Sequence, residues 1–155
     1  MDVRAKLAEL GLTLPVAAIP VGAYVPAVRT GNLVFTAGQL PLREGKIPFI
    51  GKVDGPVTPE QAKEMAQICA LNALAAVELV APVDTIVRVV RVVGYVNGVP
   101  GFIAAPGVVN GASELFIHIF GEANGKHARS AIGVAELPLD APVEIELTVE
   151  VLGEQ

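Results

Sequence analysis

The segment VEIELTVEV, residues 143–151, constrains the fold more than any other stretch of the chain. Apolar and polar side chains alternate through it without a break. Successive side chains of a β-strand point to opposite faces, so the pattern predicts a strand with one apolar and one polar face. The apolar face must be covered, and the chain is therefore expected to contain a sheet packed against other elements.

Four further segments have the composition of strands. Residues 85–97 are β-branched almost throughout and predict a long strand. Two β-prone runs, at about residues 24–29 and 32–36, predict a hairpin with its turn at Thr30-Gly31. A last strand is expected at about residues 129–136.

A capping box marks the start of the first long helix. Thr58 stands at the N-cap, Pro59 at the first helical position and Gln61 at the third. This arrangement satisfies amide groups that a helix start leaves without partners. The helix is expected over about residues 59–80, since Pro82 stops it.

A second long helix is expected at about residues 108–120, a short one at residues 2–10, and a loop rich in Gly, Pro and Lys at residues 41–57. The order hairpin, helix, strand, helix, strand, strand predicts an α+β fold, with a mixed sheet that carries both long helices on one face. The length of 155 residues suits a single domain, residues 1–155.

The composition predicts an oligomer. Hydrophobic residues make up 52% of the chain and charged residues only 17%. Apolar residues of VRVVRVV, residues 87–93, are expected on the sheet face that the helices leave open. Subunits would then pack sheet against sheet.

Other features exclude several classes of protein. The net charge is −5 and the basic residues are scattered, which argues against nucleic-acid binding. The sequence contains no apolar tract long enough to span a membrane and no export signal, so a cytosolic location is expected. Cys69 is the single cysteine and is expected in the core, not as a nucleophile.

Arg129 is the strongest candidate for chemistry. Its guanidinium either pairs with a carboxylate of the protein or binds the carboxylate of a ligand. Glu144 could be that partner, hold a water for proton transfer or be solvated, and spacing does not choose among these roles. His127 lies beside Arg129, and His118 is expected at a helix surface. The two histidines have no clustered ligands around them, so no metal is expected.

A set of motifs resembles the successive signatures of the reactive intermediate deaminase (Rid) family, also called the YjgF family. The likeness runs from about residue 15 to residue 152, and a helical extension at residues 1–14 is similar to a longer branch of the family. The motifs are GAYVP at 22–26, GNLVFTAGQLP at 31–41, VN at 109–110, ARS at 128–130, VAELP at 134–138 and VEIE at 143–146.

The resemblance implies a chorismate-mutase-like two-layer fold and a homotrimer with a central barrel-like core and ligand clefts between subunits. Family members hydrolyse enamine or imine intermediates to 2-keto acids and ammonia without metal or organic cofactor. By the resemblance, Arg129 binds the substrate carboxylate and Glu144 positions the attacking water. Tyr24 and Asn110 line the cleft.

The backbone around Gly38 and Ala131 is expected to supply further contacts by the same resemblance. The chain also departs from the family pattern: Ala131 replaces a frequent Cys, Ala37 replaces a frequent Ser, and the loop at residues 42–57 is longer. Arg129 is retained, which favours a carboxylate ligand. Both an enamine hydrolase and a ligand-binding relative without turnover remain open.

One surface is more apolar than the family pattern. It comprises residues 102–105 (Phe102, Ile103, Ala104 and Ala105), Gly107 and the region at residues 77–87. Either this is sequence drift or it is an engineered interface, through which a Rid-like trimer would bind a second protein component as a building block of a designed symmetric assembly.

Overall fold

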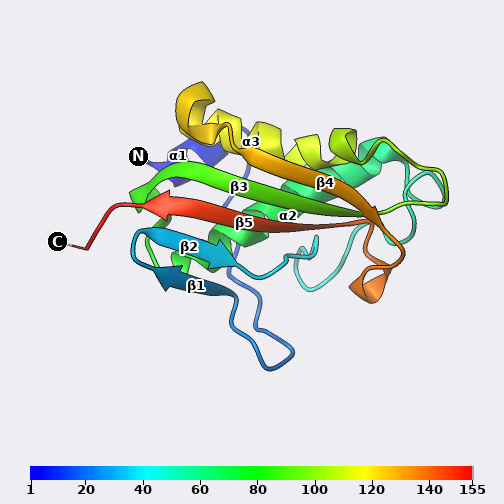
Figure 1. The fold of residues 1–155 in the computed structure, drawn as a ribbon, viewed down its shortest axis with the longest axis horizontal. Helices are drawn as coiled ribbons and strands as arrows, with labels where there is room; N and C mark the ends of the chain where they lie inside the picture. Colours follow the sequence, from blue (N-terminus) through cyan, green and yellow to red (C-terminus); the bar gives the residue numbers. More distant parts are fainter. Residues whose placement is uncertain (155) are drawn as a thin grey trace.

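A five-stranded mixed sheet carries two long helices on one face (Figure 1). The structure is a computed structural model that describes residues 1–154. The strand order is β1-β2-β5-β3-β4, and of these neighbours only β3 and β4 run parallel. The strands are β1 Ala27–Thr30, β2 Leu33–Thr36, β3 Ile86–Asn97, β4 Ala128–Val134 and β5 Val143–Val151. The helices are α1 Val3–Ala8, α2 Pro59–Glu78 and α3 Ala105–Gly125, with 3-10 turns at Val83–Thr85 and Pro138–Asp140. The predicted α+β class is confirmed.

The capping box forms as predicted and starts α2. The Gln61 amide N–H donates to Thr58 Oγ1 at 3.1 Å, and the Thr58 amide N–H donates to Gln61 Oε1 at 3.0 Å. The helix ends at Glu78, two residues before the predicted end, and Leu79 is its C-cap.

The second long helix is longer than predicted. It begins at Ala105 because Pro106 fits the first turn, where its missing N–H costs nothing. The predicted end at Phe120 coincides with a kink at Gly121, whose φ of 79° is non-helical, and helical structure resumes to Gly125. The N-terminal helix is shorter than predicted and covers Val3–Ala8.

The hairpin differs from the prediction in two details. Its first strand starts at Ala27, not at Tyr24, because Pro26 has no N–H to pair and lies just outside the strand. The turn consists of Gly31 and Asn32, with Gly31 at φ 57°. The two last predicted strands are found as β4 and β5, which both pair with β3, although β4 ends at Val134.

The alternation in β5 is confirmed as a two-faced strand. One face is buried against the helices and comprises Val143, Ile145, Leu147, Val149 and Val151. The opposite face of the sheet is not covered by any helix of residues 1–154. Of residues 87–93, which were expected to make this face apolar, Val93 lies on it opposite Glu146 and is half-buried. Val28, Phe35 and Ile132 are 52%, 43% and 47% exposed on this open face. None of the helices within residues 1–154 has the length and apolar character needed to cross a membrane.

Candidate functional site

Arg129 extends from β4 toward α3. It pairs in register with the buried Val92, so its side chain lies on the helix face of the sheet. Nη1 donates hydrogen bonds to Asn110 Oδ1 at 2.7 Å and to Ser113 Oγ at 3.2 Å. The structure therefore brings together Arg129 and Asn110, two of the candidate residues, and adds Ser113.

The half-buried guanidinium of Arg129 has only neutral partners within residues 1–154. No carboxylate oxygen of these residues lies within 4.0 Å of it, and the ion pair with Glu144 considered from the sequence does not form within the chain. Both hydrogen bonds use Nη1, so Nε and Nη2 retain their donors. Nε and Nη2 form one edge of the planar guanidinium, and their two N–H groups match the two oxygens of a carboxylate.

Ala131 lies two residues further along β4, on the same face as Arg129. Its register partner is Gly94, where a Cβ atom would collide with the Val109 side chain on α3. At this point β3 and α3 are closely packed. This packing places Asn110, which follows Val109 in α3, beside β4. We call Asn110, Ser113, Arg129 and Ala131 the arginine half-site.

Glu144 lies at the start of β5 on the open face of the sheet, opposite Tyr95 of β3. Gly38 is held beside it because Gln39 and Ile145 exchange two backbone hydrogen bonds, of 2.7 and 3.1 Å. A Cβ atom at Gly38 would collide with the Glu144 carboxylate. The Glu144 side chain therefore lies directly over the glycine.

Glu144 belongs to a small cluster of acidic and phenolic groups. Burial raises its pKa, and the nearby Glu146 carboxylate raises this pKa further. The Tyr95 hydroxyl donates a hydrogen bond to the Glu146 carboxylate, and this bond is the main reason that the pKa of Tyr95 rises to about 12. We call Gly38, Tyr95, Glu144 and Glu146 the glutamate half-site.

The two half-sites lie on opposite faces of the sheet in one chain. Arg129 pairs with Val92 on the helix face, whereas Glu144 pairs with Tyr95 on the open face. Tyr24 joins neither within residues 1–154: it precedes β1, its side chain is 56% exposed, and it forms no hydrogen bond with either half-site. The structure thus assembles two groups of predicted residues but not a complete site.

Three residues of the two half-sites, Ser113, Glu146 and Tyr95, were not predicted as site residues from the sequence. Ser113 could have been found, because it follows Asn110 by three residues and so shares its helix face. Glu146 could have been found from the alternation that places it beside Glu144 on the polar face. Tyr95 carries no such signal, since its register against β5 is set by long-range pairing.

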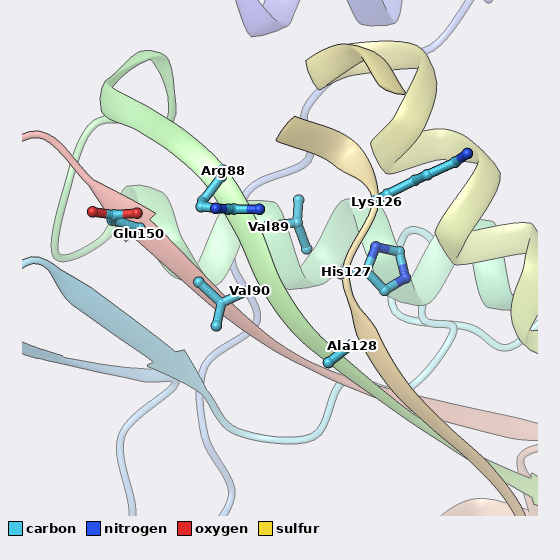
Figure 2. Close-up of a pocket in the computed structure, with 7 residues that line it drawn as sticks. All are labelled: Arg88, Val89, Val90, Lys126, His127, Ala128 and Glu150. Carbon is cyan, nitrogen blue, oxygen red and sulfur yellow. The ribbon is translucent and has the colours of Figure 1, made fainter. Parts of the chain in front are cut away.

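An open hollow of about 540 Å³ lies at the start of β4. Figure 2 shows its lining: Arg88, Val89 and Val90 come from β3, Glu150 from β5, Lys126 and His127 from the segment after α3, and Ala128 from β4. None of the predicted site residues lines it. His127 does, and it also contacts the arginine half-site through Ser113 at 2.9 Å. Within residues 1–154, no group of three or more His, Cys, Asp or Glu side chains is placed to hold a metal ion.

The apolar surface singled out in the sequence is only partly exposed. Phe102 is half-buried against the core, whereas Ile103 is 90% exposed and Ala104 is exposed beside it. Cys69 is buried and its thiol contacts the Val143 carbonyl at 3.6 Å.

Comparison with known proteins places these features in a family. The family model described as Endoribonuclease L-PSP matches residues 15–151. Protein TCP17 of Trypanosoma cruzi is 37% identical over 149 residues, which are 96% of this chain and 93% of that protein.

Solved structures of similar proteins share the fold. The Agrobacterium tumefaciens protein Atu1372, described as of unknown function, is 43% identical, with a TM-score of 0.88 and coverage of 97% of this chain and 92% of that one. A Shewanella oneidensis protein described as a candidate endoribonuclease is 28% identical, with a TM-score of 0.92 and coverage of 97% and 100%. The YjgF gene product of E. coli is 26% identical, with a TM-score of 0.64 and coverage of 86% and 92%. The chain therefore belongs to the family described as Endoribonuclease L-PSP, which is the YjgF or Rid family predicted from its motifs.

Proposed function

We propose that this protein binds small 2-imino and 2-keto acids and hydrolyses enamine and imine intermediates to 2-keto acids and ammonia. The observation that carries the proposal is the Arg129 guanidinium, which is half-buried and has only neutral hydrogen-bond partners within residues 1–154. A charge in such a place is stabilised by a partner of opposite sign. The carboxylate of a small acid supplies that partner.

Arg129 would bind the carboxylate in a fixed direction. Asn110 and Ser113 hold Nη1, so the edge formed by Nε and Nη2 faces the ligand and accepts both carboxylate oxygens. Binding the acid in this way orients its imine carbon and removes much of the entropic cost of the reaction.

Glu144 would accept a proton from the attacking water. An enamine first tautomerises to the imine, gaining a proton on carbon and losing one from nitrogen; water then adds to the imine carbon and passes a proton to Glu144, which returns it to the nitrogen. The C–N bond of this tetrahedral intermediate breaks as its hydroxyl proton moves to the nitrogen, which releases ammonia and leaves the carbonyl of the 2-keto acid. The raised pKa of Glu144 suits this role, since a base is most effective when its pKa approaches the working pH.

The complete site would form between copies of the chain. Arg129 and Glu144 lie on opposite faces of one sheet, so a single chain cannot present both to one small ligand. In a ring, the arginine half-site of each copy faces the glutamate half-site of the next. We propose a homotrimer of single-domain chains, residues 1–155 with the extension at residues 1–14. Its sheets form the central barrel-like core, and it works in the cytosol without a cofactor.

An assay of 2-aminoacrylate released from serine tests the proposal. Keto-acid formation is followed with the wild type, Arg129→Ala and Arg43→Ala, the last being an exposed arginine outside both half-sites. We expect Arg129→Ala to lower the catalysed rate by about 100-fold or more and Arg43→Ala to leave it unchanged. Equal rates for Arg129→Ala and wild type would refute the role of Arg129.

Two rival functions, ligand binding without turnover and cleavage of RNA, are tested with the same protein variants. Titration with 2-oxobutanoate identifies a ligand-binding protein without turnover, if the wild type binds the acid but does not accelerate hydrolysis. Incubation with an oligoribonucleotide tests the activity in the family's name, which the net charge of −5 and the scattered basic residues do not favour. Arg129→Ala is carried through both measurements.

The exposed Ile103 supports a second candidate function, as the docking point of a second protein component in a designed assembly built on the trimer. Light scattering with a candidate partner protein tests it. A mass of three chains that stays unchanged when the partner is added argues against this function.

A further inference from the structure

A chain of three hydrogen bonds runs from Arg129 to the end of α3. Arg129 Nη1 lies 3.2 Å from Ser113 Oγ, Ser113 Oγ lies 2.9 Å from His127 Nε2, and His127 Nδ1 lies 2.7 Å from the Gly125 carbonyl oxygen. Ser113 is only 8% exposed, so it exchanges few of these contacts for water. In the reaction proposed above Ser113 only holds Nη1 of Arg129, and His127 has no role.

The direction of each bond follows from which groups can donate. A carbonyl oxygen only accepts, so His127 Nδ1 carries a hydrogen; a guanidinium only donates, so Ser113 Oγ accepts from Arg129. The single hydrogen of the Ser113 hydroxyl then points to His127 Nε2, which accepts it. All three bonds are satisfied together when His127 is neutral and carries its hydrogen on Nδ1.

The surroundings of His127 favour the neutral ring. Burial lowers its pKa, the Arg129 charge lowers it further, and the bond to Gly125 opposes both. Phe116 packs against the ring edge-on, with centroids 6.1 Å apart and planes at 85°. Arg129 on β4 is the charge that acts on the ring, and Lys126 on its own segment, Arg88 on β3 and Glu150 on β5 line the same hollow as His127 (Figure 2). Ser113 and Phe116 of α3 bring no charge.

We propose that Ser113 and His127 are positioning residues for Arg129, and that the proton on His127 controls how tightly Arg129 binds a carboxylate. This inference rests on the proposed function, because it concerns the same carboxylate. The Ser113 oxygen fixes Nη1, and His127 fixes the Ser113 hydroxyl. A bound carboxylate neutralises Arg129 and so removes one reason for His127 to stay deprotonated. The bound carboxylate therefore increases the proton affinity of His127. By linkage, protonation of His127 increases the affinity for the carboxylate by the same factor.

Nuclear magnetic resonance of the His127 ring tests the network without any ligand. A His118→Gln background leaves His127 as the only histidine, since the chain has 2. The neutral ring is expected to carry its hydrogen on Nδ1. The pKa of His127 is expected to rise in Arg129→Gln, which loses the neighbouring charge, and in Ser113→Ala, which loses the donor to Nε2. A hydrogen on Nε2, or a pKa that Arg129→Gln leaves unchanged, would overturn the proposal.

Titration with 2-oxobutanoate between about pH 5 and about pH 8 tests the effect on affinity. The wild type is expected to bind about three- to tenfold more tightly at the acid end. His127→Gln retains an acceptor for Ser113 but does not titrate, so it should match the wild type at neutral pH and show no pH dependence. Ser113→Ala should bind more weakly throughout.

The two measurements separate this inference from the proposed function. A wild type that does not bind 2-oxobutanoate refutes carboxylate binding, while the ring measurements still decide whether His127 and Arg129 are coupled. A pH dependence of affinity that persists in His127→Gln assigns the effect to another group and overturns the inference.

Discussion

At the scale of single residues, Gly38 controls the position of Glu144. A Cβ atom there would overlap the end of the Glu144 side chain, which is flexible and can move away without displacing the backbone. Gly38→Ala should therefore displace the carboxylate and lower hydrolysis by roughly tenfold or more, with little change in thermal stability. Gly133→Ala is the matched control, because the nearest atom to a Cβ there is the Val96 carbonyl oxygen at 3.9 Å. Equal loss of activity in both variants would contradict the prediction.

The ionised Glu144 side chain is expected to lower the free energy of unfolding at neutral pH. Its pKa is raised above the ordinary value of 4.5, so the folded state binds more protons than the unfolded state between the two pKa values. Its contribution to stability is thus fully present below the unfolded pKa and is lost as pH rises through the folded pKa.

Glu144→Gln should therefore be more stable than the wild type at neutral pH and should lose this advantage in acid, while hydrolysis falls by about 100- to 10,000-fold. Thermal unfolding from about pH 4 to about pH 8 measures the difference. Glu150→Gln, on the same strand, serves as the comparison. An advantage of Glu144→Gln that does not depend on pH would contradict the assignment.

At the scale of elements, the contact between α2 and α3 depends on one glycine. A Cβ atom at Gly111 would collide with the backbone carbonyl of Lys63, and a backbone cannot move aside as a side chain can. This close approach packs α3 against α2 and thereby sets where Asn110 and Ser113 stand above β4. The arginine half-site therefore depends on helix packing as well as on its own residues.

Gly111→Ala should lower the free energy of unfolding by about 2 kcal/mol or more through overpacking. Gly107→Ala, on the same helix, meets no atom within 4 Å and should raise it by roughly 0.5–1 kcal/mol, since alanine favours the helix. Urea unfolding of both variants measures the two effects. Stabilisation by both substitutions would show that the helices can separate freely.

At the scale of the whole molecule, the open sheet face accounts for part of the high content of hydrophobic residues, which is 52%. Val28, Phe35 and Ile132 are exposed on the same face as Glu144. Packing this face against another copy would bury them and would also bring Glu144 close to a neighbouring chain. Solubility and catalysis would then depend on the same assembly.

Mixing two inactive variants tests the shared site. The glutamate half-site is intact in Arg129→Ala, and the arginine half-site is intact in Glu144→Gln. Unfolding them together and refolding should restore about a quarter of the wild-type activity, the fraction of random interfaces that pair two intact halves. Arg129→Ala mixed with the Arg129→Ala/Glu144→Gln double variant contains no intact arginine and should recover none. Absence of recovery in the first mixture would place both halves in one chain.

The sequence by itself determined the local elements. The alternation at residues 143–151 fixed a two-faced strand, and Thr58 with Gln61 fixed the start of α2, because both signals act between near neighbours. The motifs around Arg129 and Glu144 also identified the family and named the residues of interest. Among the helices and strands, the differences lie at their ends, as at Pro26, which has no N–H to pair and therefore lies outside β1.

Only the tertiary structure decided where the candidate site residues lie relative to one another. The strand order β1-β2-β5-β3-β4 and the register of β3 with β4 and β5 place Arg129 and Glu144 on opposite faces. The same packing joins Ser113 to His127, and Tyr95 to Glu146. These pairings connect residues far apart in the chain, and their free energy depends on how all the layers fit together. No local pattern in the sequence carries that information.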